Sequence, residues 1–248
     1  NTSGSNNIAI GRQALDATTT ADDNIAIGVG ALGVNETGTA NVAVGKNALD
    51  ANTTADHNIA IGKDALGVNT TGAQNVAIGS LALDANQTAS NNTAVGYNSL
   101  GANTTGAGNT AIGRISMELN TEGGQNTAVG SNSLSANTDG NQNTAIGNNS
   151  LQVNSTGDSN TSVGANALRS NQTANANTAV GKSSLDANTT GANNTAVGKD
   201  SLLVNTDGAN NVAVGFDALK ANTSGNTNTA VGTTSLTAVT DGDDNSAL

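Results

Sequence analysis

Small and branched aliphatic residues recur along the chain at one fixed interval of 17 residues, separated by polar segments. The recurring motif is Asn-x-Ala-(Ile/Val)-Gly, and its Asn returns from Asn7 to Asn245 without insertion or deletion. Globular domains tolerate insertions in their loops. An uninterrupted interval therefore indicates short coils that stack directly on one another, with their side chains in registered columns.

Each column has its own character when the motif Asn is numbered position zero. Position two is Ala in every coil except at Ser162, and position three is always Ile or Val. Position seven is Ala or Ser, position eight is Leu except at Met117, and position ten is mostly Ala or Val. Position eleven is mostly Asn, followed by Thr-Thr-Gly or a variant of it.

These columns predict an all-β fold. Positions one to three form a short β-branched stretch that Gly ends, and positions seven to ten are expected to form a second short strand. Asn-Thr-Thr-Gly is turn chemistry, and Gly and Asn recur too often for a helix. We therefore predict a parallel β-solenoid, or β-roll, of about 14 coils. It forms a single repeat domain over 1–248, with coils over 7–244 and incomplete flanking coils at 1–6 and 245–248.

Alternation along a strand predicts which columns face inward. Position two is tiny and nearly invariant, as a narrow interior requires, and positions eight and ten are expected to complete that interior. Positions one and three then point outward; the alternative places position three inside and Ala outside. An outward Ile/Val stripe would be an exposed apolar patch, which usually marks an interface. The candidate oligomer interface is Ile27, Val44, Ile61, Ile78, Val95, Ile112, Val129, Ile146, Val163, Val180, Val197, Val214 and Val231.

Variation is concentrated at positions five, six and nine. We expect any ligand to meet these outward side chains rather than a pocket; the alternative is a passive spacer. Position nine alternates between Asp and Gly from Asp16 to Gly101, which indicates that the early part grew from a two-coil unit.

Composition supports a thin body. Aromatic residues make up 1% of the chain, and proline and cysteine are absent. A rounded core needs bulky side chains, and disulfides or thiolate metal sites need cysteine. The formal net charge of −11 argues against nucleic acid and anionic membranes as partners, since both require basic patches. No run of apolar residues is long enough to insert into a membrane.

Catalytic and metal-binding chemistry is weakly represented. His57, the only histidine, is expected to be a solvated turn residue beside Asp56. The acidic group Asp241, Asp243 and Asp244 lacks the Gly-Gly-x-Gly-x-Asp calcium pattern. Sequons such as Asn52-Thr53-Thr54 recur with the coil and are better explained by turn chemistry. We therefore expect no catalytic, cofactor or metal site, and no enzymatic activity.

The stretch Asn92-Thr93-Ala94-Val95-Gly96-Tyr97-Asn98-Ser99-Leu100 resembles the YadA-like head repeats of trimeric autotransporter adhesins. It is equally similar to repeats in phage and virus tail-fibre proteins, and the resemblance extends over essentially the whole chain. It implies a left-handed parallel β-roll, a homotrimer with three chains side by side, and an extracellular position on a cell surface or virion fibre. It also implies attachment, with a host-surface protein or a glycan as partner.

The leading hypothesis is thus a structural and adhesive fibre segment, and the alternative is an ice-binding solenoid. Stacked coils would space threonines by about 4.8 Å, close to an ice lattice repeat. One Thr column lies at position one: Thr93, Thr110, Thr127, Thr144, Thr161, Thr178, Thr195 and Thr229. Another lies at position twelve: Thr53, Thr70, Thr104, Thr121, Thr138, Thr189, Thr206 and Thr223.

The unbroken spacing predicts an elongated particle. Stacking about 14 coils at ~4.8 Å per coil gives a rod about 70 Å long. Small-angle X-ray scattering of the purified protein should give the profile of a rod. A near-spherical profile would contradict the prediction.

Overall fold

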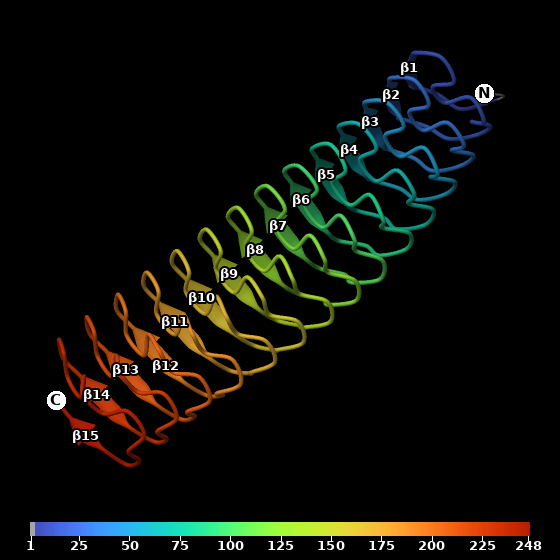
Figure 1. Cartoon of the computed structure of the whole chain (residues 1–248). Coiled ribbons are helices and arrows are strands. Elements are labelled where there is room, and N and C mark those ends of the chain that lie inside the picture. Colours follow the sequence, from blue (N-terminus) through green and yellow to red (C-terminus); the bar gives the residue numbers. More distant parts are fainter. Residues whose placement is uncertain (1–2) are drawn as a thin grey trace. The chain divides into compact units, whose positions relative to one another are not determined.

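In the computed structural model, which describes residues 3–248, the chain divides into two compact units, with the division between Gln125 and Asn126. Each unit is a parallel β-solenoid built from 17-residue coils, as the repeat predicts (Figure 1). The described residues contain no helix. Accordingly, none of them belongs to a helix with the length and apolar character needed to span a bilayer.

Every coil contributes one short strand, at positions one to three. The first unit contains β1 (Ile8–Ile10), β2 (Ile25–Ile27), β3 (Val42–Val44), β4 (Ile59–Ile61), β5 (Val76–Ile78), β6 (Thr93–Val95) and β7 (Thr110–Ile112). The second contains β8 (Thr127–Val129), β9 (Thr144–Ile146), β10 (Thr161–Val163), β11 (Thr178–Val180), β12 (Thr195–Val197), β13 (Val212–Val214), β14 (Thr229–Val231) and β15 (Ser246–Ala247).

Within each unit, consecutive strands pair in parallel and in register. Ala26 lies opposite Ala43 between β2 and β3, and Ala179 lies opposite Ala196 between β11 and β12. The same pairing joins β1 through β7 in the first unit. It joins β8 through β15 in the second. The columns read from the sequence are therefore real rows of side chains.

The predicted second strand at positions seven to ten is wrong. Those residues form turns, because the residues at positions six and eight have positive φ; at position eight φ lies between 47° and 52° in every coil. Coil-to-coil hydrogen bonds nevertheless continue around the turns. The backbone N–H of Leu49 donates to Ala65 O at 3.0 Å, and that of Ala51 donates to Gly67 O at 3.1 Å. Stacking thus satisfies backbone groups well beyond the sheet.

The core of each coil is narrow. The Ala of position two, the Ala or Ser of position seven and the Leu of position eight are almost all fully buried. The prediction that position ten completes this interior is wrong: Val34 and Leu119 are 45% and 50% exposed. Because the chain turns through left-handed residues here, adjacent positions seven and eight both point inward and strand alternation no longer applies.

Ser162, the one departure from Ala at position two, is accommodated by hydrogen bonds. Its hydroxyl lies 2.8 Å from Ala167 O, as a donor, and 2.6 Å from the Ser150 hydroxyl. The buried oxygen is therefore satisfied, which removes the usual penalty for a polar atom in a core.

Two columns of buried asparagines close each coil from 24 to 227, whereas the first and last coils have Thr18 and Val239 at position eleven. At position zero, the backbone N–H of Asn41 donates to Asn24 Oδ1 of the preceding coil at 2.9 Å. At position eleven, Asn52 Nδ2 donates to Asn35 Oδ1 at 2.8 Å. Both columns also donate to one carbonyl in their own coil: Ala55 O accepts from Asn41 Nδ2 at 2.8 Å and from Asn52 Nδ2 at 3.1 Å. Each coil is thereby clamped shut and tied to its neighbours.

Glycine at position four is required by a close backbone contact. These glycines have φ between +126° and +141°, which L side chains rarely adopt. A Cβ on Gly45 would lie 2.4 Å from the carbonyl oxygen of Gly62 in the next coil. The motif Gly therefore lets successive coils approach at this corner.

The asparagine clamp yields a stability prediction. In Asn103→Ala, Asn86 Oδ1 loses its donor and Gly106 O keeps only the bond from Asn92. An unsatisfied buried polar group costs about 1–3 kcal/mol, so the free energy of unfolding should fall by at least ~1 kcal/mol. Urea denaturation would measure this. The control Gln87→Ala, at an exposed turn position, should change stability by less than ~0.5 kcal/mol.

Candidate functional surfaces

The Ile/Val residues of position three lie on the outer face of the sheet, as predicted. The residue between positions one and three, Ala except for Ser162 in β10, is fully buried in β2 to β14, where both flanking residues are exposed or half-buried. Ile112 is 41% exposed and Val180 is 37% exposed. In-register pairing brings the residues of each unit into one unbroken row. The alternative, with position three inside, is wrong.

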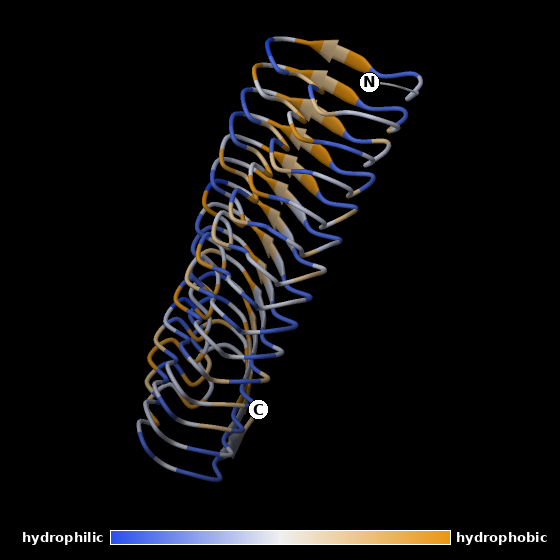
Figure 2. Cartoon of the chain, turned by 90° about the vertical axis from the view of Figure 1, so that its right-hand side faces the viewer, coloured by the Kyte–Doolittle hydropathy of each residue, from blue (hydrophilic) through white to orange (hydrophobic). Residues whose placement is uncertain are grey.

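The outer sheet face changes in character along the chain, with the change after β5 in the first unit. In β1 to β5 both outward positions are Ile or Val, and in β6 to β12 and in β14 position one is Thr. Figure 2 shows the N-terminal strands coloured hydrophobic at both ends, whereas later strands are paler. Neither outward position carries a charged residue in any strand. The face is therefore wholly apolar at first and mixed afterwards.

The two threonine columns have different environments. At position twelve the hydroxyl donates to the next coil: Thr189 Oγ1 lies 2.9 Å from Thr206 O, and Thr104 Oγ1 lies 3.0 Å from Thr121 O. At position one, Thr161 and Thr178 lie side by side on the outer face and are half-buried. The position-twelve hydroxyls therefore serve stacking, and the position-one threonines face outward.

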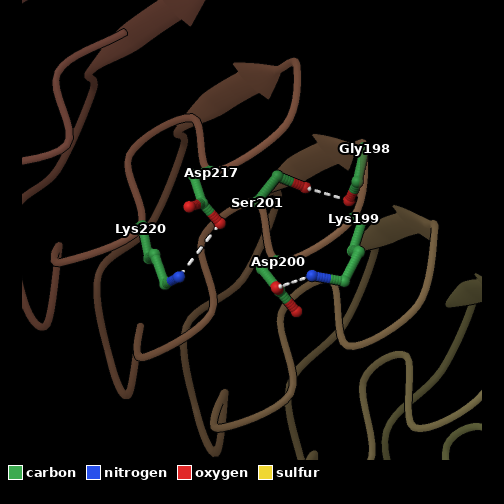
Figure 3. Close-up of polar contacts among 6 residues, drawn as sticks. All are labelled: Gly198, Lys199, Asp200, Ser201, Asp217 and Lys220. Carbon is green, nitrogen blue, oxygen red and sulfur yellow. Dashed lines mark hydrogen bonds and ion pairs between the residues drawn. The ribbon is translucent and has the colours of Figure 1, made fainter. Parts of the chain in front are cut away.

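The variable positions five, six and nine form a second surface, in which position six lies between the other two. Figure 3 shows this order in the second unit, where Lys199 (position five) pairs with Asp200 (position six). One coil on, Asp217 (position six) pairs with Lys220 (position nine) at 3.0 Å. The Lys199 ammonium also lies 5.0 Å from the centre of the Phe216 ring. Position six can therefore contact either neighbouring column.

Some of the opposite charges on this surface form ion pairs. Arg169 contacts Asp186 at 2.8 Å, and Lys63 contacts Asp64 at 2.9 Å. The hydrogen bond from Lys63 holds the pKa of Asp64 below its ordinary value. Burial raises the pKa of Asp186, which the nearby Arg169 charge partly offsets. Exposed pairs of this kind contribute little to stability because water and salt screen them, so they shape the surface more than they stabilise the fold.

A recess of about 300 Å³ opens among the variable positions of the first three coils. Each of its two walls carries a cation, an amide and a carboxylate in that order: Arg12, Gln13 and Asp16 from one coil, and Lys46, Asn47 and Asp50 from the coil two further on. The coil between contributes Val29, Gly30, Gly33 and Val34. We expected ligands to meet outward side chains rather than a pocket. The recess is a pocket, but those variable side chains line it.

The weaker candidates from the sequence do not gather into a site. His57 is exposed in a turn, and the Asp56 carboxylate instead accepts from the backbone N–H of Thr39 at 2.6 Å. The Asp243 and Asp244 carboxylates accept hydrogen bonds from Asn226 and Thr227 of the preceding coil. Among residues 3–248, no three His, Cys, Asp or Glu side chains are grouped as metal ligands would be.

The recurring sequons are explained by burial. Asn52 is fully buried, and its Nδ2 donates to Asn35 Oδ1 and to Ala55 O. A glycan cannot be attached to a buried amide nitrogen in the folded chain. The position-eleven sequons are therefore a product of the asparagine ladder.

Sequence reasoning missed the recess, although a signal was present. Position six is a large or polar residue in nearly every coil, and Gly30 is its one glycine. Gly30 and Gly33 leave one coil without side chains at positions six and nine, which indicates a recess in the surface at that coil. Recognising it required knowing that positions six and nine lie close together: the N–H of Gly33 donates to Gly30 O at 3.2 Å.

Buried carboxylates on this surface predict a pH effect. Burial and, secondarily, the Asp64 charge raise the pKa of Asp84 above its ordinary value of 3.8. The folded state therefore binds this proton more tightly than the unfolded state does. The free energy of unfolding should fall as pH rises from about 3.8 through the raised folded value.

Asp84→Asn mimics the neutral acid and should be more stable than the wild type at about pH 7, while matching it near pH 3. Urea denaturation at both pH values would measure the difference. The control is Asp16→Asn, which changes the net charge by the same amount at an exposed residue. An equal gain from Asp16→Asn would contradict the prediction.

Comparison with known protein families gave no match to this sequence, and comparison with curated proteins gave no significant match either.

Proposed function

We propose that this chain is a structural, non-enzymatic segment of an extracellular fibre, on a cell surface or a virion. It self-associates as a homotrimer through the position-three stripe and presents its variable surface for attachment. The resemblance to YadA-like heads and to tail-fibre repeats supports the trimer and the left-handed roll.

One observation carries the proposal: the outer sheet face combines exposed Ile and Val in register with a complete lack of charge. Large exposed apolar patches on soluble proteins mark interaction sites. Ile61 and Ile78 are each 38% exposed and adjacent in β4 and β5, and the row continues through the first unit. A second copy would bury this row without leaving a charge unpaired, which favours self-association over a polar partner.

Attachment is assigned to the variable surface because its side chains are not needed for stacking. Tyr97 is 51% exposed and Phe216 is 44% exposed, and each is an isolated aromatic group among polar neighbours. Such a surface makes weak contacts with a host-surface protein or glycan. Repetition along a fibre and across three chains would multiply those contacts into avidity.

Acidic substitutions test the stripe. The variant Val163→Asp, Val180→Asp, Val197→Asp places like charges side by side in β10 to β12. We expect the oligomer to dissociate into monomers, because burying three carboxylates in an apolar interface is prohibitively unfavourable. Sedimentation equilibrium would measure the change from trimer to monomer, and circular dichroism would verify the fold.

The matched control is Thr156→Asp, Thr173→Asp, Thr190→Asp. These exposed turn residues occupy position thirteen, where Asp139 and Asp207 occur naturally. This control adds the same charge and should leave the oligomer intact. A wild-type protein that is monomeric at all accessible concentrations would contradict the proposal.

Ice binding is the second candidate function, and one observation favours it. The position-one threonines of β9 to β12 lie in register on an uncharged outer face: Thr144, Thr161, Thr178 and Thr195. A parallel row of Ile and Val side chains at position three lies beside this row of threonines on the same face. The two functions use the same face, so the oligomeric state separates them: thermal hysteresis from a monomer would favour ice binding and exclude the fibre interface.

A further inference from the structure

The recess in the first unit exists because one coil lacks two side chains. Gly30, at position six, is buried with φ +72°, and a Cβ there would meet the Asn47 Oδ1 atom at 3.0 Å. A Cβ on Gly33, at position nine, would lie 2.6 Å from Asp50 Oδ1. Asp50 therefore leans over the bare backbone of Gly33. The missing side chains leave a slot between the walls of the two flanking coils.

The slot has a positive end and a negative end. Both position-five residues at its walls, Arg12 and Lys46, are cations, and both position-nine residues, Asp16 and Asp50, are carboxylates. Position six separates these columns, as the Lys199–Asp200 and Asp217–Lys220 contacts demonstrate in the other unit (Figure 3). The neutral amides of position six and the Gly30 backbone occupy the middle.

The four charges of the slot form no ion pair within the described part of the chain. Ion pairs there join Lys63 to Asp64, Arg169 to Asp186, Lys199 to Asp200, and Lys220 to Asp217. Position six supplies the partner in three of these pairs. The slot instead has Gly30 at position six in its middle coil, and Asn47 Nδ2 is directed to Asp64 Oδ1 at 3.0 Å. The slot therefore lacks the position-six counter-charge present in those three pairs, and the Asp64 carboxylate of the next coil interacts with Lys46 only at longer range.

Apolar groups complete the two ends. Val29 occupies position five of the middle coil and is 38% exposed, and Val34 occupies position ten, next to Gly33, and is 45% exposed. Partial burial against apolar groups strengthens a charge–charge contact relative to one in open water. Burial already raises the pKa of Asp50, with a further contribution from the Asp64 charge. A cationic group of a ligand would relieve that cost.

We propose that this slot binds a small zwitterion, with its anionic group between Arg12 and Lys46 and its cationic group between Asp16 and Asp50. The ligand class is an amino-carboxylate or amino-phosphate compound whose charges are separated by several bonds. The site rests on the first unit alone and does not depend on self-association. A cavity of about 300 Å³ is at the lower end of the usual range for small-molecule sites.

A length series of ω-amino acids tests the charge arrangement. Titration of the full chain with β-alanine, γ-aminobutyrate and ε-aminocaproate, followed by NMR or calorimetry, should give saturable binding to a single site with one preferred length. The best zwitterion should bind roughly tenfold more tightly than butyrate or butylamine, each of which carries one charge. Phosphoethanolamine in the same titration compares a phosphate with a carboxylate.

Filling the slot provides the decisive variant. Gly30→Asn adds the side chain that position six carries at Asn47 and Asn98, both with positive φ, so the fold should be retained. Gly108→Asn is the matched control, because Gly108 also has φ +72° and a Cβ there would meet nothing closer than 3.7 Å. Gly30→Asn should abolish binding, and Gly108→Asn should leave it unchanged.

Charge variants at the exposed walls give an independent test. Asp16→Asn with Asp50→Asn should remove the advantage of the zwitterion over butyrate. Arg12→Gln with Lys46→Gln should remove its advantage over butylamine. Binding of zwitterions no tighter than that of the singly charged compounds, or equal binding by Gly30→Asn, would overturn the proposal. Equally tight binding of neutral methyl glucoside would overturn the assigned ligand class.

Discussion

The stacking of each coil against the next, through hydrogen bonds that repeat at every interval, is the constraint on which the rest of the structure depends. Because the coil contains little apolar bulk, its interior cannot be held by a large core alone. Asn24 illustrates the solution, since its backbone N–H and its side-chain Nδ2 bond to three different parts of the coil stack. Buried polar groups, which would destabilise a protein if left unpaired, form hydrogen bonds here with the equivalent groups of the neighbouring coils.

This constraint explains why the columns differ in their tolerance to change. Gly at position four is fixed because the next coil's backbone occupies the space where a side chain would lie. Asn is invariant at position zero and departs at position eleven only at Thr18 and Val239, in the first and last coils, because an amide supplies both the donor and the acceptor that the ladder needs. Positions five, six and nine meet solvent and neighbouring side chains, so they carry Lys46, Tyr97 or Phe216 without consequence for stacking. Function is therefore free to develop there.

Much of the fold could be predicted from the sequence. The strand at positions one to three, the inward Ala and Leu and the outward Ile and Val follow from periodicity and size. The turn at positions six to eight could not, because Leu is an unusual residue at positive φ and nothing in Leu49 or Leu66 signals it. That conformation is imposed by the stack, where Leu49 must fill the interior while its N–H donates to the next coil. The slot was missed for the same reason: without the turn, Gly30 and Gly33 are not seen to lie together.

Hydrogen bonding that repeats from coil to coil also restricts how such a chain can evolve. Every column repeats at the same interval of 17 residues, so an insertion or deletion of one residue would displace all the side chains of a coil from their columns at once. Duplication or loss of a whole coil leaves every column intact, because each coil contacts only its immediate neighbours. Changes in length must therefore occur in complete repeats. Unequal recombination between the gene segments that encode these repeated coils would supply them.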